Sequence, residues 1–384
     1  MSNKQNSATQ GTASVTNGEA LIAWATKHMP VLQASLLALE DSGAISGIRI
    51  AVALQLEAKS ASFILGLQRA GAKPIVYSRA APDSAAQDIA SALHNSGIAI
   101  ANSIDALFEA RPQILLDDGA ELIQHAQTNN IPLIGASETS AAGIRAIEAL
   151  PTGQNPFNIV DLNTSTLKQL IENEFGVGQS CVMAFVDITN LQLAGRPVAV
   201  IGYGNVGRGV AAHAQAFGAR VVIAETDPVK TVAARYQGHQ VSTTEEALTN
   251  SEVVFCAADE ASALTIEHIS SLRDGAFLCI AGEAQTPALN YLMANAEAKT
   301  LRTDVVQYTF GNGRSVKLIA QGKTLNNHGG EGSPIEAMDI SLALQLEAIK
   351  QLLAPENSSR STPCILGIDA KSESKLAEVI LESL

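Results

Sequence analysis

A glycine-rich turn between an apolar strand and an Ala-rich helix constrains the fold of this chain more than any other feature. Residues 198–209 read Val-Ala-Val-Ile-Gly-Tyr-Gly-Asn-Val-Gly-Arg-Gly, and a helical pattern follows to Phe217. Gly202 permits the tight turn, Gly204 lets backbone approach a diphosphate, and Gly207 lets the helix pack close to the strand. The helix N-terminus then holds the phosphate charge. The segment therefore predicts a dinucleotide-binding Rossmann half-domain.

The acidic residue that ends the next strand selects the dinucleotide. Gly218 ends the helix, and the following apolar strand finishes at Glu225. A carboxylate there can accept hydrogen bonds from both ribose hydroxyls of NAD, and it would repel the 2′-phosphate of NADP. We therefore expect NAD as the cofactor. The residues expected to contact it in this segment are Gly202, Gly204, Asn205, Val206, Gly207 and Glu225.

Length, charge and cysteine usage limit the class of protein. A chain of 384 residues exceeds the usual size of one hydrophobic core, so two domains are expected. A net charge of −13 without a basic run argues against nucleic acid or an anionic membrane as partner and favours a small-molecule substrate. The four cysteines show no metal-ligand spacing, which predicts reduced thiols, a cytoplasmic location and no metal site. No apolar run is long enough to predict a transmembrane helix or a secretory signal.

Short β-branched runs alternate with helical patterns along most of the chain, which is typical of parallel sheets with crossover helices. We predict an α/β fold with two doubly wound parallel-sheet domains, one of them the Rossmann NAD-binding domain. The strands expected in the first domain are 48–54, 74–77, 98–101, 113–116 and 131–134, and those in the second are 197–201, 221–224, 253–256, 276–280 and 304–306.

Composition also suggests where the domains begin and end. Residues 1–18 are polar and are expected to form a disordered tail. The substrate domain is expected over 19–180, completed by a helix at 335–353, and the NAD-binding domain over 181–334. Residues 354–384 are expected to form a divergent C-terminal tail, with a polar loop at 356–362, a short strand and an amphipathic helix.

Several short stretches in one order resemble a known family. They are Trp24-Ala25, Met29-Pro30-Val31-Leu32, Leu115-Leu-Asp117-Asp118-Gly119, Gly135-Ala-Ser137-Glu138 and Gly176-Val-Gly178-Gln179-Ser180. With the cofactor loop and Glu225, they resemble the adenosylhomocysteinase family over about residues 21–350. Members of that family hold NAD permanently and use it to oxidise, eliminate, hydrate and re-reduce a nucleoside thioether.

The helix expected over 163–174 resembles the family's catalytic helix. Lys168 and Glu172 are four residues apart, on a helix face next to the apolar residues expected to be buried. In the family, this lysine takes part in hydride chemistry at the ribose 3′-hydroxyl, and the following carboxylate is an aspartate. Asn173 matches a residue beside the nicotinamide, and Asn326 matches a cofactor-facing asparagine. The alternative is a surface ion pair, although lysine before glutamate is the less favourable order for one.

Asp117 and Asp118 follow a predicted strand at the edge of a parallel sheet where ligands gather. Either carboxylate could act on a substrate, or one of them could simply cap the helix that begins near Ala120. Asp118 is the expected base for a carbon-bound proton.

Other positions depart from the family pattern. The family's histidine near the N-terminal strand is Gln55 here, and an amide cannot accept a proton near neutral pH. Two further family histidines are replaced by Glu283 and Ser333, and a glutamate is replaced by Thr139. His328 could replace lost proton-transfer capacity, but a lone histidine there is more often structural.

Lys59 falls where the family places a glutamate or glutamine that receives the adenine amino group. An ammonium offers only donors, so Lys59 disfavours adenine and predicts a ligand with an acceptor: a carboxylate, a phosphate or a base carbonyl. The alternative is that Lys59 pairs with Glu57 or points into solvent. The expected substrate contacts are Gln55, Glu57, Lys59, Glu138, Glu283, His328, Ser333 and Met338.

These observations favour an adenosylhomocysteinase-like enzyme of one-carbon metabolism that oxidises a substrate alcohol transiently. Elimination and hydration, or epimerisation, would follow, on a substrate other than adenosylhomocysteine. Three alternatives stay open: ordinary adenosylhomocysteine hydrolysis, a catalytically silent NAD-binding regulator, and a plain NAD-dependent dehydrogenase. The resemblance also implies a homo-oligomer, dimer or tetramer. Because the family's Lys-Pro and Tyr-Arg-Tyr tail is absent, NAD is expected to exchange faster.

Overall fold

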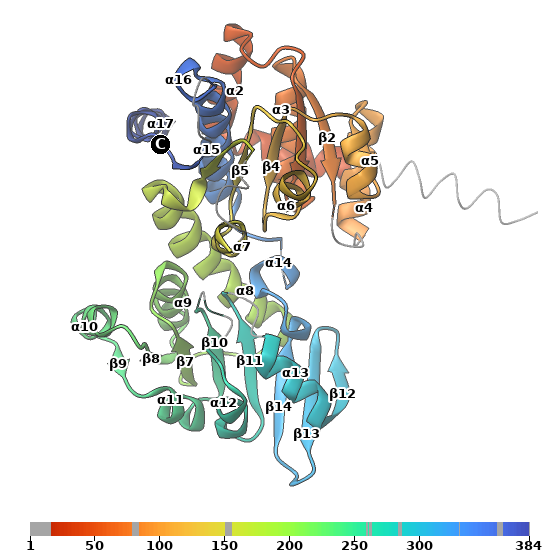
Figure 1. Cartoon of the computed structure of the whole chain (residues 1–384). Helices are drawn as coiled ribbons and strands as arrows, with labels where there is room; N and C mark the ends of the chain where they lie inside the picture. Colours follow the sequence, from red (N-terminus) through yellow and green to blue (C-terminus); the bar gives the residue numbers. More distant parts are fainter. Residues whose placement is uncertain are drawn as a thin grey trace, which may run out of the picture. The chain divides into compact units, whose positions relative to one another are not determined.

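The computed structural model describes residues 17–78, 84–149, 156–258, 260, 263–282, 286–329, 331–358 and 364–383. The chain divides into two compact units (Figure 1). The first holds the described residues up to Lys168 and from Met338 onward, and the second is Gln169–Ala337. These limits differ from the predicted boundaries, and residues of the expected tail 354–384 belong to the first unit. Of the expected tail 1–18, only residues 17 and 18 are described, and they lie in a helix that is described over 17–27.

The first unit contains a seven-stranded parallel sheet in the order β15-β6-β5-β4-β1-β2-β3. Its strand order reverses between β1 and β4, which is the point where open α/β sheets bind ligands at the carboxyl ends of their strands. The strands are β1 Arg49–Ala53, β2 Lys73–Tyr77, β3 Ala99–Ala101, β4 Ile114–Asp117, β5 Gly135–Glu138, β6 Asn158–Asp161 and β15 Ile365–Gly367.

Helices cover this sheet, and one buried carboxylate joins two of them. They are α2 Pro30–Ser42, α3 Ala58–Arg69, α4 Ser84–Asn95, α5 Ile104–Glu109, α6 Glu121–Thr128, α7 Ala141–Glu148, α15 Ile335–Leu353, α16 Pro355–Ser358 and α17 Ala370–Ser383. Asp339 of α15 is 3% exposed and accepts hydrogen bonds from Leu32 N at 2.6 Å and Val31 N at 3.1 Å. It therefore caps the N-terminus of α2, whose own N-cap residue Met29 has no side-chain acceptor.

Replacing Asp339 by alanine is expected to lower the free energy of unfolding by about 2–4 kcal/mol, because two buried N–H groups lose a charged acceptor. Urea unfolding measures this difference. Glu336→Gln, at an exposed position of the same helix, is the matched control and should change stability by less than about 0.5 kcal/mol. Equal stability of the two variants would contradict the capping role.

The second unit contains an eight-stranded sheet in the order β12-β13-β14-β11-β10-β7-β8-β9. It is parallel from β14 to β9, and an antiparallel β12–β13–β14 edge follows. Alternate residues of the central strands pack into two apolar cores, one on each face. The strands are β7 Pro197–Ile201, β8 Arg220–Ala224, β9 Gln240–Val241, β10 Val253–Cys256, β11 Ala276–Ile280, β12 Ala296–Arg302, β13 Val305–Phe310 and β14 Ser315–Ile319.

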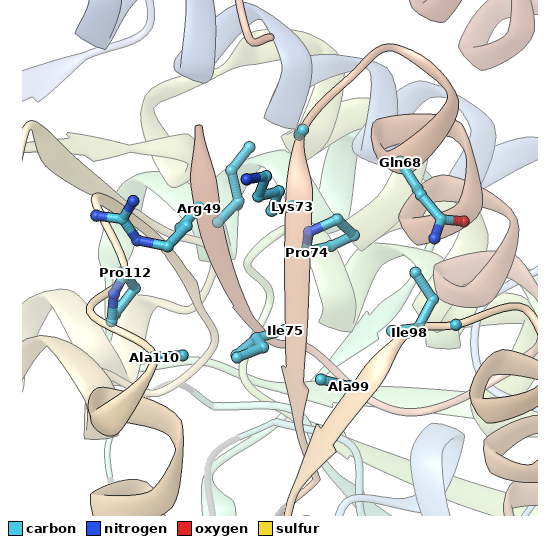
Figure 2. A pocket seen from close by; sticks show the side chains of 12 residues that line it. Arg49, Gln68, Lys73, Pro74, Ile75, Ile98, Ala99, Ala110 and Pro112 are labelled. Carbon is cyan, nitrogen blue, oxygen red and sulfur yellow. The ribbon is translucent and has the colours of Figure 1, made fainter. Parts of the chain in front are cut away.

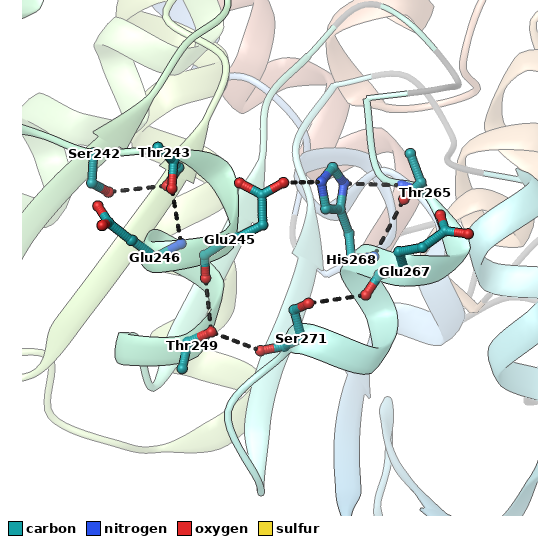
Figure 3. Close-up of polar contacts among 9 residues, drawn as sticks. All are labelled: Ser242, Thr243, Glu245, Glu246, Thr249, Thr265, Glu267, His268 and Ser271. Atoms are coloured by element: carbon teal, nitrogen blue, oxygen red, sulfur yellow. Dashed lines mark hydrogen bonds and ion pairs between the residues drawn. The ribbon is translucent and has the colours of Figure 1, made fainter.

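Most helices of the second unit cross between these strands. They are α8 Gly178–Thr189, α9 Asn205–Ala216, α10 Pro228–Tyr236, α11 Thr244–Asn250, α12 Ile266–Ser271, α13 Thr286–Asn295 and α14 Leu325–His328. Figure 3 shows that α11 and α12 share polar contacts: His268 Nε2 lies 3.5 Å from Glu245 Oε1, and Thr249 Oγ1 lies 3.3 Å from the Ser271 carbonyl oxygen. The same histidine accepts from Thr265 N through Nδ1 at 3.1 Å, so its role is structural. None of the described helices has the length and apolar character needed to span a bilayer.

The α/β fold with two parallel-sheet domains is confirmed, but one strand is wrong. The apolar run 131–134 is irregular, and β5 begins after it at Gly135. A Cβ on Gly135 would stand 2.4 Å from Leu352 Cδ2, and Ser137 Oγ donates to Gln345 Oε1 at 2.6 Å. These contacts with α15 make the small, polar segment a buried strand. The predicted loop 356–362 is helical over α16 as far as it is described.

Candidate active site

The glycine loop of the second unit leaves the first turn of α9 accessible. Gly202 has a φ of +94°, which a residue with a side chain rarely adopts. A Cβ on Gly207 would stand 2.1 Å from the Gly202 carbonyl oxygen, whereas a Cβ on Gly204 would meet no atom within 4 Å. The turn is therefore tight inside and open outside, the shape that a diphosphate needs at a helix N-terminus.

Glu225 is held rigidly beside this loop. It follows β8, and its Oε2 accepts from Tyr203 N at 2.6 Å, while Oε1 accepts from Thr226 N at 2.7 Å and Asp227 N at 2.9 Å. Thr226 Oγ1 also lies 3.4 Å from Oε1, whereas Oε2 has a single donor, so the remaining capacity for a ligand hydroxyl lies at Oε2. This is a prepared acceptor for a ribose.

Asn326 on α14 carries a buried polar atom that the protein does not satisfy. The residue is 6% exposed, and its Oδ1 has no hydrogen-bond partner among the residues that the structure describes. A buried acceptor without a donor destabilises a fold, so such atoms often mark ligand positions. Together with the glycine loop and Glu225, Asn326 makes the second unit fit a dinucleotide cofactor.

The predicted catalytic helix has an unexpected geometry. An α-helix was expected over 163–174, but a 3-10 turn at Leu162–Thr164 is followed by a π-helix, η2, over Lys168–Val177. In a π-helix, residues five apart are joined by the backbone hydrogen bond, so Lys168 and Asn173 lie on adjacent turns. Lys168 is 4% exposed, and Glu172 and Asn173 are partly buried. Single π-turns are frequent at functional sites.

Glycines allow this helix to pack closely against α9. A Cβ on Gly209 would stand 1.7 Å from the Glu174 carbonyl oxygen, and a Cβ on Gly178 would stand 2.5 Å from Gly209 Cα. The π-helix and α8 therefore approach α9 at backbone distance. Polar side chains strengthen the contact: Asn205 Nδ2 donates to Gln169 Oε1 at 2.7 Å, and Arg208 pairs with Glu174 at 2.7 Å and with Asn205.

Replacing Gly209 by alanine should separate α9 from the π-helix, because the new Cβ meets backbone that cannot move alone. We expect a loss of at least about 1–3 kcal/mol in stability and a clear fall in bound NAD. Urea unfolding and the NAD content after denaturation measure the two effects. Gly311→Ala is the control, because a Cβ there meets no atom within 4 Å. Full NAD content and unchanged stability in Gly209→Ala would contradict the packing account.

Strand register in the first unit gathers carboxylates at one sheet edge. Asp117, Glu138 and Asp161 are register partners at the carboxyl ends of β4, β5 and β6. Asp117 is the last residue of its strand and is fully buried, and its carboxylate accepts from Asp118 N at 3.0 Å and Ile123 N at 2.9 Å. Asp117 is therefore the capping residue, while Asp118 stands just beyond the strand and is partly exposed.

Glu138 holds the turn that carries Asp118. Its fully buried carboxylate accepts from Gly119 N and Ala120 N, both at 2.8 Å, and from Ser140 N at 2.7 Å and Ser140 Oγ at 2.6 Å. Burial raises the pKa of Glu138, which these hydrogen bonds oppose. These hydrogen bonds satisfy the Glu138 carboxylate without a ligand. A role of Glu138 in substrate binding therefore stays a prediction.

Lys59 forms an ion pair with Glu57, and its role in substrate binding stays a prediction. Its ammonium lies 2.8 Å from Glu57 Oε2, and the side chains of Lys59 and Glu57 are only 6% and 17% exposed. Glu57 also caps α3 in a box with Ser60. Gln55 is exposed just after β1. The pair thus presents a donor and an acceptor side by side in a largely desolvated position.

Asp161 was missed by sequence reasoning because β6 was not predicted. It ends β6, its carboxylate accepts from Asn163 N at 2.8 Å, and burial raises its pKa while the charge of Lys168 lowers it. Asp161 is therefore an electrostatic partner of the buried lysine. Its place at a strand end just before the predicted catalytic helix was the available signal.

The remaining predicted substrate contacts are less informative. His328 is exposed, with Nδ1 3.2 Å from the Thr324 carbonyl oxygen. Ser333 is buried, and a Cβ on Gly176 would stand 3.3 Å from its Cβ. Met338 is partly buried on α15, and Glu283 lies outside the described residues. Across the part of the chain that the structure describes, no His, Cys, Asp and Glu cluster could hold a metal ion.

A cavity of about 280 Å³ lies elsewhere, between Arg49, Lys73, Ile75 and Ala99 (Figure 2). Arg49, Lys73 and Ala99 are the first residues of β1, β2 and β3. The cavity therefore opens at the amino ends of the strands, whereas ligands in such sheets bind at the carboxyl ends. We do not place the active site there.

Comparison with known proteins settles the family. The model of the "S-adenosyl-L-homocysteine hydrolase, NAD binding domain" matches residues 173–332. An adenosylhomocysteinase from Thermotoga maritima is 34% identical over 96% of this chain and 95% of its own length. This chain belongs to the adenosylhomocysteinase family. An S-inosyl-L-homocysteine hydrolase from Methanopyrus kandleri is 33% identical over 96% of this chain and 90% of its own length, and the Thermococcus kodakarensis adenosylhomocysteinase is 31% identical.

Family membership confirms two expectations. The resemblance to adenosylhomocysteinase is correct, and NAD is the cofactor of the domain that contains the glycine loop. The chain is thus a member of an NAD-using hydrolase family. Among the relatives, both S-adenosyl and S-inosyl substrates occur in the names at similar identity.

Proposed function

We propose that this enzyme hydrolyses a nucleoside thioether of homocysteine whose purine carries a 6-oxo group, as in S-inosyl-L-homocysteine. The observation that carries this proposal is the buried Lys59–Glu57 pair. The resemblance aligns Lys59 with the residue that reads the base. Hypoxanthine offers an acceptor at O6 and a donor at N1, which are complementary to the Lys59 ammonium and the Glu57 carboxylate.

Adenine presents the opposite pattern. Its amino group is a donor and its N1 an acceptor, so adenine would face an ammonium with a donor and a carboxylate with an acceptor. Mismatched buried polar groups lower kcat/KM strongly, by up to about 10⁴–10⁵-fold where a site is built around one hydrogen-bonding group. Adenosylhomocysteine is therefore the second candidate, which the identity to adenosylhomocysteinases supports and the Lys59–Glu57 pair opposes.

The roles of the remaining residues follow from burial and charge. When bound, NAD supplies the hydride acceptor for the substrate alcohol and returns the hydride at the end. Lys168, buried beside the charge of Asp161, would assist deprotonation of that alcohol. Glu172 would orient Lys168 or relay its proton, and Asn173 would lie beside the cofactor. Asp118, held by the Glu138 turn, would accept the proton from the carbon that the ketone acidifies.

Release of homocysteine thiol by purified holoenzyme tests this function. S-inosyl-L-homocysteine should give thiol and inosine with no net NADH. Net NADH would instead indicate a plain dehydrogenase, and racemised substrate without thiol would indicate epimerisation. A silent NAD-binding regulator would release no thiol from either nucleoside. Homo-oligomerisation and a place in one-carbon metabolism stay predictions of the same proposal.

A further inference from the structure

The C-terminal segment 364–383 folds onto the start of the catalytic helix of its own chain. Its strand β15 pairs in parallel with β6, with Ile365 opposite Ile159 and Gly367 opposite Asp161. Ile368 N donates to Thr164 Oγ1 at 3.0 Å, in the turn just before that helix. The segment is thus anchored beside the strand and turn that lead to Lys168.

One carboxylate of α17 reaches the helix itself. Glu373 Oε1 accepts from Leu167 N at 2.8 Å and from Ser165 Oγ at 2.7 Å. Ser165 is fully buried, and its Oγ accepts from Lys168 N at 3.1 Å. Because an ionised carboxylate only accepts, the Ser165 hydroxyl must donate to Glu373, which turns its lone pair toward Lys168 N. Ser165 is therefore an N-cap whose orientation is set by Glu373.

We propose that Glu373 is a positioning residue for Lys168. The two helix N–H groups in this network belong to Leu167 and Lys168, and the hydroxyl belongs to Ser165 at the start of the same helix. Loss of the carboxylate therefore releases the backbone that carries the ammonium. A negative charge at a helix N-terminus also stabilises that end of the helix. The catalytic consequence rests on the role proposed for Lys168, whereas the structural consequence does not.

Two readouts on Glu373→Ala and Glu373→Gln test the proposal. Hydrogen exchange of the Leu167 and Lys168 amides should speed up at least about tenfold in the alanine variant, because their acceptors are lost or misoriented. The kcat for thiol release should fall about 10- to 100-fold, as small misplacement of a catalytic group does, with KM and NAD content unchanged. The isosteric glutamine variant, which keeps an acceptor oxygen but no charge, should lie between alanine and wild type in both readouts.

A control and a coupled variant sharpen the outcome. Glu382→Ala, at an exposed position of the same helix, should leave exchange and kcat as in wild type. Ser165→Ala combined with Glu373→Ala should cost less than the sum of the single changes, because the two act through one cap. Wild-type exchange at Lys168 in Glu373→Ala would overturn the proposal. If the Glu373→Ala amides exchanged faster but the wild-type enzyme released no thiol, the capping role of Glu373 would stand. The proposed hydrolase function would then be rejected.

Discussion

Lys168→Met is expected to lower kcat for thiol release by about 10²–10⁴-fold while the protein keeps its NAD, because proton transfer by a positioned group contributes on that order. Methionine fills the buried space of the lysine side chain but has no ammonium. The substrate alcohol then loses the group that assists its deprotonation, and Asp161 loses the charge that lowers its pKa. Steady-state thiol release and NAD content after denaturation are the measurements.

The matched control for this variant is Lys73→Met. Lys73 is an exposed lysine at the amino end of β2, in the same unit but away from the carboxyl edge of the sheet. It should retain wild-type kcat. A Lys168→Met enzyme that turned over at more than about a third of the wild-type rate would remove Lys168 from the chemistry, since such a change is below about 1 kcal/mol of barrier.

Lys59→Gln is expected to remove most of the discrimination between the two purines. The glutamine amide can turn either its oxygen or its NH2 toward the base, so it accommodates a 6-amino or a 6-oxo group. The S-inosyl preference in kcat/KM should fall from at least about 100-fold to within about tenfold, mainly through a gain on the S-adenosyl substrate. Parallel kcat/KM values for both nucleosides give the ratio.

Lys73→Gln makes the same substitution at an exposed position and should leave the ratio unchanged. If Lys59→Gln kept the wild-type ratio, the Lys59–Glu57 pair would have no part in reading the base. The pair would then be a buried ion pair whose role is confined to the start of α3.

The central strands of the second sheet could be predicted accurately, whereas its strands β9, β12 and β14 were not predicted. Pro197–Ile201, Val253–Cys256 and Ala276–Ile280 are continuous apolar runs, which buried parallel strands require, and their predicted bounds agree with the structure. β5 and β6 instead carry polar residues that distant side chains satisfy, such as Ser137 with Gln345 and Asn158 with the Asn357 carbonyl oxygen. Because these partners lie far away in the sequence, a local sequence pattern cannot reveal them.

The same limit applies to the candidate site. The glycine loop and Glu225 are local and could be predicted, because strand, turn and helix lie next to one another in the sequence. Whether Asp117 or Asp118 caps α6 depends on where backbone N–H groups point. Glu373 lies 206 residues from Leu167, and no spacing rule connects them. The close approach of η2 to α9 depends on Gly209, which is distant in the sequence from the Glu174 carbonyl oxygen that it faces.

Competition between S-inosyl- and S-adenosyl-L-homocysteine in one solution of purified holoenzyme tests the central claim most directly. Because both substrates meet the same enzyme, the ratio of their initial consumption rates at equal concentrations gives the ratio of kcat/KM at any enzyme concentration. The Lys59–Glu57 pair predicts a ratio of at least about 100 in favour of the inosyl compound. Equal consumption of the two, or faster consumption of the adenosyl compound, would contradict it.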